Sequence, residues 1–148
     1  GLVGSEMCIR DSGLDAVQLH GRVEELDWAK FLPGVFVIRV FHMTPDEEKN
    51  ASTLHDALRP GYHHIILLDT ANQGGQDGGS GASFNWSHVS NIPVPFLIAG
   101  GLTPDNVQEA LTQSLAAGVD TSSGVETEGQ KDTAKITAYV ENARRVLS

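Results

Sequence analysis

The chain is poor in three features that often define a protein's class: cysteine, basic charge and long apolar runs. Its 148 residues include one cysteine, Cys8, so an internal disulfide is impossible and a reducing, cytosolic setting fits. The formal net charge of −9 argues against a nucleic-acid-binding surface. No stretch approaches the roughly 18–20 continuous apolar residues of a membrane span, and the first residues do not resemble a secretory signal. We therefore expect a cytoplasmic protein that binds neither nucleic acid nor membrane.

Metal-binding patterns are also absent from the sequence. No cluster of histidine, cysteine and carboxylate residues has metal-ligand spacing, so we expect no metal site and no cofactor. His63 and His64 precede an apolar run, on the side away from the loops that follow it, and we expect them to be structural.

Short apolar runs alternate with helical patterns along the chain. The continuous run Ile65-Ile66-Leu67-Leu68 is typical of a strand that is covered on both faces. Helix starts are predicted at Thr44-Pro45 and Thr103-Pro104, and a last helix after Asp132. That last helix should bury Ile136, Tyr139, Val140, Ala143 and Leu147. Strands are predicted at 16–19, 35–40, 65–68, 96–99 and 118–120, with shorter helices at 24–30 and 86–89.

This alternation predicts an α/β fold with a parallel sheet, and two architectures fit it. One is a complete, doubly wound open sheet that binds its ligand at a topological switch point. The other is a (β/α)8 barrel, whose ligand loops all follow the carboxyl ends of the strands. Such a barrel takes about 200–250 residues, so this chain would supply only part of one.

Two late loops have the composition of an anion site. Gly100-Gly101 leads into the Thr103-Pro104 helix start, where backbone N–H groups lie beside the positive end of the helix dipole. Ser122-Ser123-Gly124 follows the last strand and offers hydroxyl and N–H donors. Glycine before a helix is also ordinary turn chemistry, but two such loops after consecutive strands favour a phosphate site.

Three further segments have two interpretations each. Asp69 ends a buried strand and either caps the following turn or acts as a general acid. His20 also ends a strand, and either lines a pocket or bonds a backbone carbonyl. The loop from Thr70 to Gly81 has five glycines in twelve residues, which fits either a plain surface loop or one that approaches a ligand.

Several motifs together resemble the phosphoribosylanthranilate isomerases of tryptophan biosynthesis, in a fungal-like form. The resemblance covers about residues 13–147, and its last two motifs are the most specific. The matching stretches are Gly13 to Gly21, Leu67-Leu68-Asp69, Gly78 to Gly81 with Phe84-Asn85-Trp86, Ala99 to Val107, Gly118 to Glu126, and Gly129 with Lys131-Asp132 and Ile136.

The resemblance implies a (β/α)8 barrel of which this chain holds about strands four to eight. It also implies a cofactor-free Amadori rearrangement, with Asp69 as the general acid that protonates the ribose ring oxygen. The phosphorylated substrate would be bound by Gly100, Gly101, Asp120, Ser122, Ser123 and Gly124, with His20 in the pocket and Gly79 and Gly81 in a loop that closes over it. In fungi this unit is often fused to other tryptophan-pathway domains.

The sequence departs from the family pattern in ways that affect activity. The family's general base is a cysteine in a Lys-Ile-Cys-Gly-like motif, and neither the position nor the neighbours of Cys8 match it. The basic residue that meets the anthranilate carboxylate is also missing. Residues 1–12 fit nothing in the family and resemble translated adapter sequence, whereas residues 13–148 form the partial barrel domain. We therefore expect the chain alone to be inactive.

Other functions stay open at this point. Another sugar-phosphate barrel enzyme would need a lysine-rich catalytic set or metal-binding histidines at strand ends, and the sequence has neither. A five-stranded, flavodoxin-like module that binds a phosphate ligand is the non-enzyme alternative. A partial barrel should leave apolar faces uncovered near residues 14–40, and a complete module should not.

Overall fold

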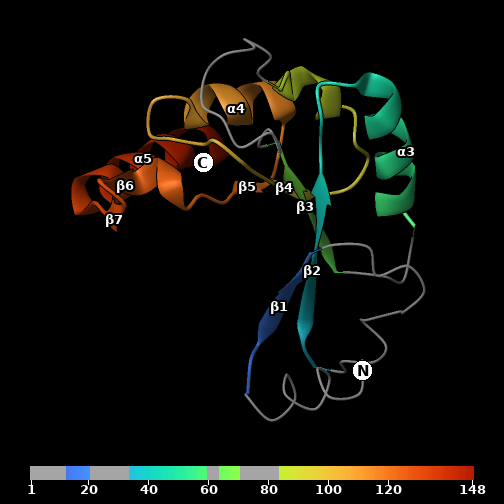
Figure 1. The fold of residues 1–148 in the computed structure, drawn as a ribbon, viewed down its shortest axis with the longest axis horizontal. Helices are drawn as coiled ribbons and strands as arrows, with labels where there is room; N and C mark the ends of the chain where they lie inside the picture. Colours follow the sequence, from blue (N-terminus) through green and yellow to red (C-terminus); the bar gives the residue numbers. More distant parts are fainter. Residues whose placement is uncertain (1–12, 21–33, 60–63, 71–83) are drawn as a thin grey trace.

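A computed structural model describes residues 13–20, 34–59, 64–70 and 84–148 of the chain. Its centre is a five-stranded, fully parallel sheet (Figure 1). The strands are β1 (Ala16–Leu19), β2 (Phe36–His42), β3 (Ile65–Asp69), β4 (Phe96–Ala99) and β5 (Gly118–Val119). All five strand predictions are confirmed: two have the predicted ends, and the ends of the other three shift by one or two residues. The predicted helix at 24–30 lies outside the described residues.

The order of the strands distinguishes the two architectures. Each strand pairs with the next one in sequence, in the order β1-β2-β3-β4-β5. A doubly wound sheet needs a reversal of strand order at its switch point, and the described sheet has none. The doubly wound, flavodoxin-like alternative is therefore wrong for this sheet, whereas the sequential order is that of a barrel wall.

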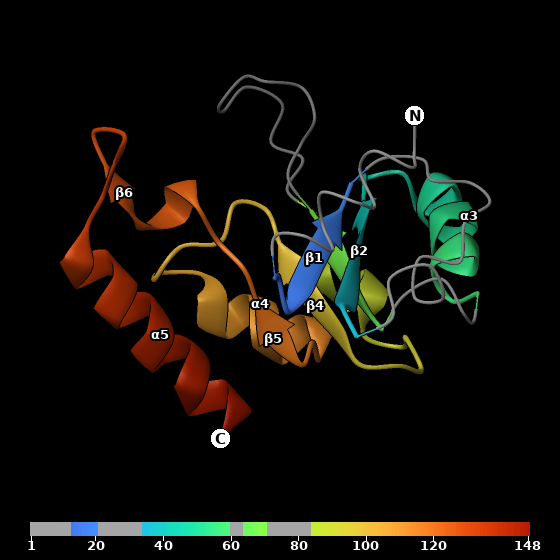
Figure 2. The same ribbon diagram turned by 90° about the horizontal axis from the view of Figure 1, so that it is seen from below.

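The described helices all contribute to one core on one side of the sheet. They are α3 (Glu47–Ala57), α4 (Val107–Ser114) and α5 (Thr133–Leu147). Ala57, Leu111 and Tyr139 join the same cluster as Ile66, Leu68 and Ile98 of the sheet. On the other face a smaller apolar cluster is formed by Val40, Leu67 and Ala99, with Ile38 and Leu97 packed against it. In Figures 1 and 2 helices α4 and α5 pack together, and α3 flanks β2 and β3 farther along the sheet.

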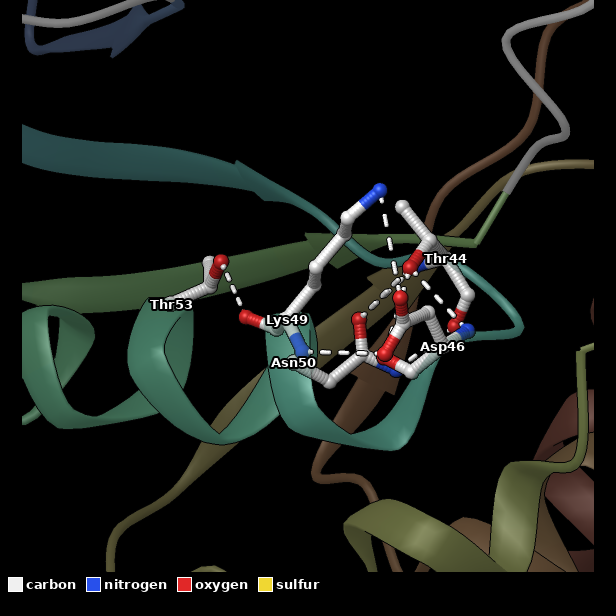
Figure 3. A network of polar contacts seen from close by, with 5 residues as sticks. All are labelled: Thr44, Asp46, Lys49, Asn50 and Thr53. Carbon is white, nitrogen blue, oxygen red and sulfur yellow. Dashed lines mark hydrogen bonds and ion pairs between the residues drawn. The ribbon is translucent and has the colours of Figure 1, made fainter.

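The first described helix begins later than the sequence suggested. Thr44 was the predicted cap, but α3 begins at Glu47 and its first turn is closed by Asp46. The Asp46 carbonyl accepts the N–H of Asn50 at 3.1 Å, and its carboxylate accepts the N–H of Lys49 at 3.2 Å. Thr44 instead supports this turn, since its hydroxyl accepts the Asp46 N–H at 3.2 Å (Figure 3).

The loop between β2 and α3 is fixed by one buried amide. The Asn50 side chain accepts the Thr44 N–H at 2.8 Å and donates to the Thr44 carbonyl at 2.6 Å. It therefore satisfies both backbone groups of Thr44 (Figure 3). This loop directly follows His42, so the hydrogen bonds of Asn50 hold the carboxyl end of β2 in place.

The last two helices confirm part of the predicted pattern. Asp132 caps α5 by accepting hydrogen bonds from the N–H groups of Ala134 and Lys135. The pKa of the Asp132 carboxyl is lowered, chiefly because it also accepts a hydrogen bond from Thr127. Tyr139 and Ala143 are buried as predicted, but Ile136, Val140 and Leu147 are exposed. Nothing in the described part of the chain covers that side of α5.

The regular part of α4 begins at Val107, one turn after Thr103. None of the described helices is both long and apolar enough to cross a membrane.

Candidate functional site

The carboxyl edge of the sheet brings polar side chains into one row. The strand register places His42 beside Asp69 and Asp69 beside Ala99. The Asp120 N–H donates to the Ile98 carbonyl at 2.9 Å, which sets Asp120 next to Ala99 in the same row. Side chains alternate between faces along a strand. His42, Asp69 and Asp120 therefore share the face of Val40 and Leu67, away from the helices.

Ala99 is the small residue in the middle of this row. Parallel strands lie about 4.8 Å apart, so the backbones of Asp69 and Asp120 are separated by about 10 Å. The small Ala99 side chain therefore lies between the two carboxylates in this row.

His42 also belongs to this row, although it was not among the site residues predicted from the sequence. Its Nδ1 lies 3.4 Å from Oδ2 of Asp69, and both side chains are partly exposed. The buried Nδ1 of His42 has no hydrogen-bond partner among the described residues. The approach to Asp69 is therefore within ion-pair distance but is not a hydrogen bond. A signal was present, because His42 ends the run Phe36 to Phe41 just as His20 ends the run before it.

His20 lies next along the same edge. Its ring is 6.2 Å from that of His42, centroid to centroid, and its Nε2 is 3.2 Å from Nε2 of Gln18. Among the described residues His20 therefore contacts a side chain and not the backbone carbonyl considered above. Alternation along β1 places Gln18 and His20 on the same face as His42.

The two glycine-containing loops are packed directly against each other. The Thr121 hydroxyl donates to the Leu102 carbonyl at 2.7 Å. Gly124 approaches the same carbonyl so closely that a Cβ there would lie 1.7 Å from the Leu102 oxygen. Only glycine fits this junction without displacing backbone. The sequence placed both loops after neighbouring strands, and the structure brings them into contact.

The first of these loops needs its glycines for conformation as well. Gly100 and Gly101 have φ angles of 95° and 66°, in the left-handed region that favours glycine. Beyond them, the Thr103 N–H donates to the Asn106 side chain at 2.8 Å, and the Asn106 amide donates to the Gly101 carbonyl at 2.9 Å. Because the Thr103 N–H is already used, an anion at this loop would be bound through the glycine amides.

Asp120 also acts on a buried tyrosine behind the loops. Tyr139 of α5 is 7% exposed, and its hydroxyl has no hydrogen-bond partner among the described residues. Burial raises the pKa of the Tyr139 hydroxyl, and the negative charge of Asp120 raises it further. The hydroxyl of Tyr139 therefore stays protonated in the core on the helix side of the sheet.

Other predicted residues fall in different places. Ser122 and Ser123 are exposed at the start of the 3-10 helix η2 (Ser123–Val125). Gly79 and Gly81 lie outside the described residues, as does Cys8. Asn85 caps the 3-10 helix η1 (Trp86–Val89) by accepting the Ser87 N–H at 3.1 Å. Within the described ranges no three histidine, cysteine or acidic residues are placed to hold a metal ion.

Comparisons of the sequence with known proteins all point to one family. The family described as N-(5'phosphoribosyl)anthranilate (PRA) isomerase matches residues 6–142. A multifunctional tryptophan biosynthesis protein of Schizosaccharomyces pombe is 44% identical over 132 residues, which is 89% of this chain and 16% of that protein. An N-(5'-phosphoribosyl)anthranilate isomerase of Eremothecium gossypii is 41% identical over 145 residues, which is 93% of this chain and 65% of the relative. The chain thus spans less than two thirds of these relatives.

A solved structure agrees with the sequence matches. It is a phosphoribosyl anthranilate isomerase in complex with reduced 1-(o-carboxyphenylamino)-1-deoxyribulose 5-phosphate. The TM-score is 0.69 at 28% identity, over 95% of this chain and 66% of that one. The parallel five-stranded sheet is therefore shared with a protein that holds a phosphorylated ligand.

Proposed function

This chain belongs to the N-(5'-phosphoribosyl)anthranilate isomerase family, and from that premise we propose that it forms the phosphate-binding and acid-bearing part of such an isomerase. The reaction is the Amadori rearrangement of N-(5'-phosphoribosyl)anthranilate to 1-(2-carboxyphenylamino)-1-deoxyribulose 5-phosphate. The observation that carries the proposal is the junction of Leu102 with Gly124, beside a row that contains Asp69.

In this proposal Asp69 is the general acid. It protonates the ribose ring oxygen, so that the ring opens to a Schiff base, and a separate base then removes the C2′ proton. Asp69 lies at the carboxyl end of a buried strand, with its side chain partly exposed toward the shared face. We propose that His42, 3.4 Å away, restricts the orientation of the Asp69 carboxylate.

The phosphate lies on the two packed loops. Its donors in this proposal are the amides of Gly100, Gly101 and Gly124 together with Ser122 and Ser123. Backbone amides suit this purpose in an acidic protein, because they attract an anion locally whatever the net charge. Asp120 and His20 contact the same ligand in this proposal, and Gly79 and Gly81, outside the described residues, keep the substrate-binding role that the resemblance implies.

We also propose that the chain is part of a larger barrel and that it is inactive alone. Five strands do not close a barrel, and the sequence has no Lys-Ile-Cys-Gly-like motif for the general base. Leu14 and Phe36 are 51% and 46% exposed beside the first two strands, as expected of an uncovered barrel wall. The match to a small part of a multifunctional relative supports a fused parent polypeptide.

A graft tests this function. Residues 13–148 would be joined behind the N-terminal part of the E. gossypii isomerase, which supplies the missing strands and the base. We expect the graft to consume phosphoribosylanthranilate, followed as loss of anthranilate-type fluorescence, and the isolated chain to show no turnover. Turnover by the isolated chain would refute its proposed inactivity, and a folded graft without turnover would refute the isomerase assignment.

A further inference from the structure

One basic side chain reaches the second loop from outside it. Lys131 belongs to the small hairpin formed by β6 (Glu126–Thr127) and β7 (Gln130–Lys131), where it pairs across the strands with Glu126. Its Nζ donates to the Ser122 carbonyl at 2.8 Å and to the Ser122 hydroxyl oxygen at 3.1 Å. The same Nζ lies 2.5 Å from Oε1 of Glu126. The hairpin is thereby tied to Ser122, a residue of the proposed phosphate loop.

The direction of these hydrogen bonds has a chemical consequence. An ammonium group only donates, so the Ser122 hydroxyl oxygen must be the acceptor of the bond from Lys131. The hydroxyl hydrogen of Ser122 is therefore directed elsewhere and can be donated to an anion. Donation from a charged group polarises the hydroxyl, which makes it a better donor in turn.

The neighbouring charges show why Lys131 matters in this position. The Glu126 carboxylate accepts from the Lys131 ammonium group, and the Lys135 ammonium group donates to the Glu126 backbone carbonyl at 2.6 Å. Asp132 accepts from Thr127 at 2.7 Å and from the first amides of α5. Among the described contacts, Lys131 is thus the cation that bonds directly to a residue of the phosphate loop.

We propose that Lys131 is a positioning residue of the phosphate site: it fixes the backbone of Ser122 and orients the Ser122 hydroxyl as a donor to the phosphate. This inference rests on the proposed function, because it presupposes that the phosphate lies on residues 122–124. Oε1 of Glu126 accepts a third hydrogen bond from the same ammonium group.

The test is titration of the chain with inorganic phosphate, followed by the amide NMR signals of residues 100–101 and 122–124. For K131M we expect a Kd about tenfold weaker than that of the unchanged chain. K131R keeps the charge and the donors and should restore binding to within about threefold. The matched control is K49M, which removes the same charge from exposed Lys49 on α3 and should change the Kd by less than about twofold.

E126Q separates positioning from support of the hairpin. If Lys131 acts through Ser122, E126Q leaves phosphate binding equal or tighter, because glutamine keeps an oxygen that accepts from Lys131 and removes a negative charge near the phosphate loop. Equal weakening by E126Q and K131M would overturn the inference, and so would a K131M variant that binds as tightly as the unchanged chain. If phosphate leaves the amides of residues 100–101 and 122–124 of the unchanged chain unaffected, the phosphate assignment fails and this inference falls with it.

Discussion

Replacing Asp69 with asparagine in the grafted isomerase is expected to lower kcat by a factor of about 10² to 10⁴. That is the usual contribution of a positioned general acid. Asparagine keeps the size and polarity of the side chain but cannot deliver a proton to the ribose ring oxygen. Steady-state turnover, followed by substrate fluorescence, measures the loss.

The matched control for this substitution is Asp56→Asn. Asp56 is exposed on α3, away from the carboxyl edge of the sheet. Its substitution removes the same charge as D69N does. We expect D56N to retain kcat within about twofold, and D69N to bind the reduced product analogue nearly as well as the unchanged graft. A D69N enzyme with unchanged kcat would contradict the assignment of the acid to Asp69.

Gly124→Ala is expected to destabilise the isolated chain by about 3 kcal/mol, the upper end of the usual range for overpacking. The new Cβ would overlap the Leu102 carbonyl, with 1.7 Å to its oxygen and 2.8 Å to its carbon. Because the obstacle is backbone, it cannot move aside by a rotamer change. Urea denaturation followed by circular dichroism measures the difference in the free energy of unfolding.

Gly101→Ala is the natural comparison for this prediction. Gly101 has a φ of 66°, but nothing lies within 4 Å of a Cβ added there. Its substitution should cost only the left-handed backbone penalty of about 1–2 kcal/mol. If G124A proves no less stable than G101A, the two loops are not packed as described.

The sequence predicted the sheet well because its signals are local. Runs such as Ile65 to Leu68 are apolar throughout, and the turn residues that bound them are explicit. The Asp132 cap was likewise readable, since the helix pattern follows it at once. Strand order was not readable, because periodicity alone fits a doubly wound sheet as well as a barrel wall, and only the pairing of each strand with its successor distinguishes them.

The errors came from tertiary context. Ile136 and Val140 share a helical stripe with Tyr139, yet no described element lies against them, so they remain exposed. Thr44 has the sequence of a cap, but the helix starts at Glu47 because Asn50 binds both backbone groups of Thr44. His42 was missed although it ends its strand as His20 does, because only the strand register places it beside Asp69.

The assignment of the phosphate to the described loops is tested by locating the phosphate of a bound ligand. The chain would be titrated with reduced 1-(o-carboxyphenylamino)-1-deoxyribulose 5-phosphate while its amide NMR signals are recorded. We expect saturable shifts that are largest at Gly100, Gly101 and residues 122–124. Saturable binding that leaves these amides unchanged and shifts signals elsewhere would contradict it.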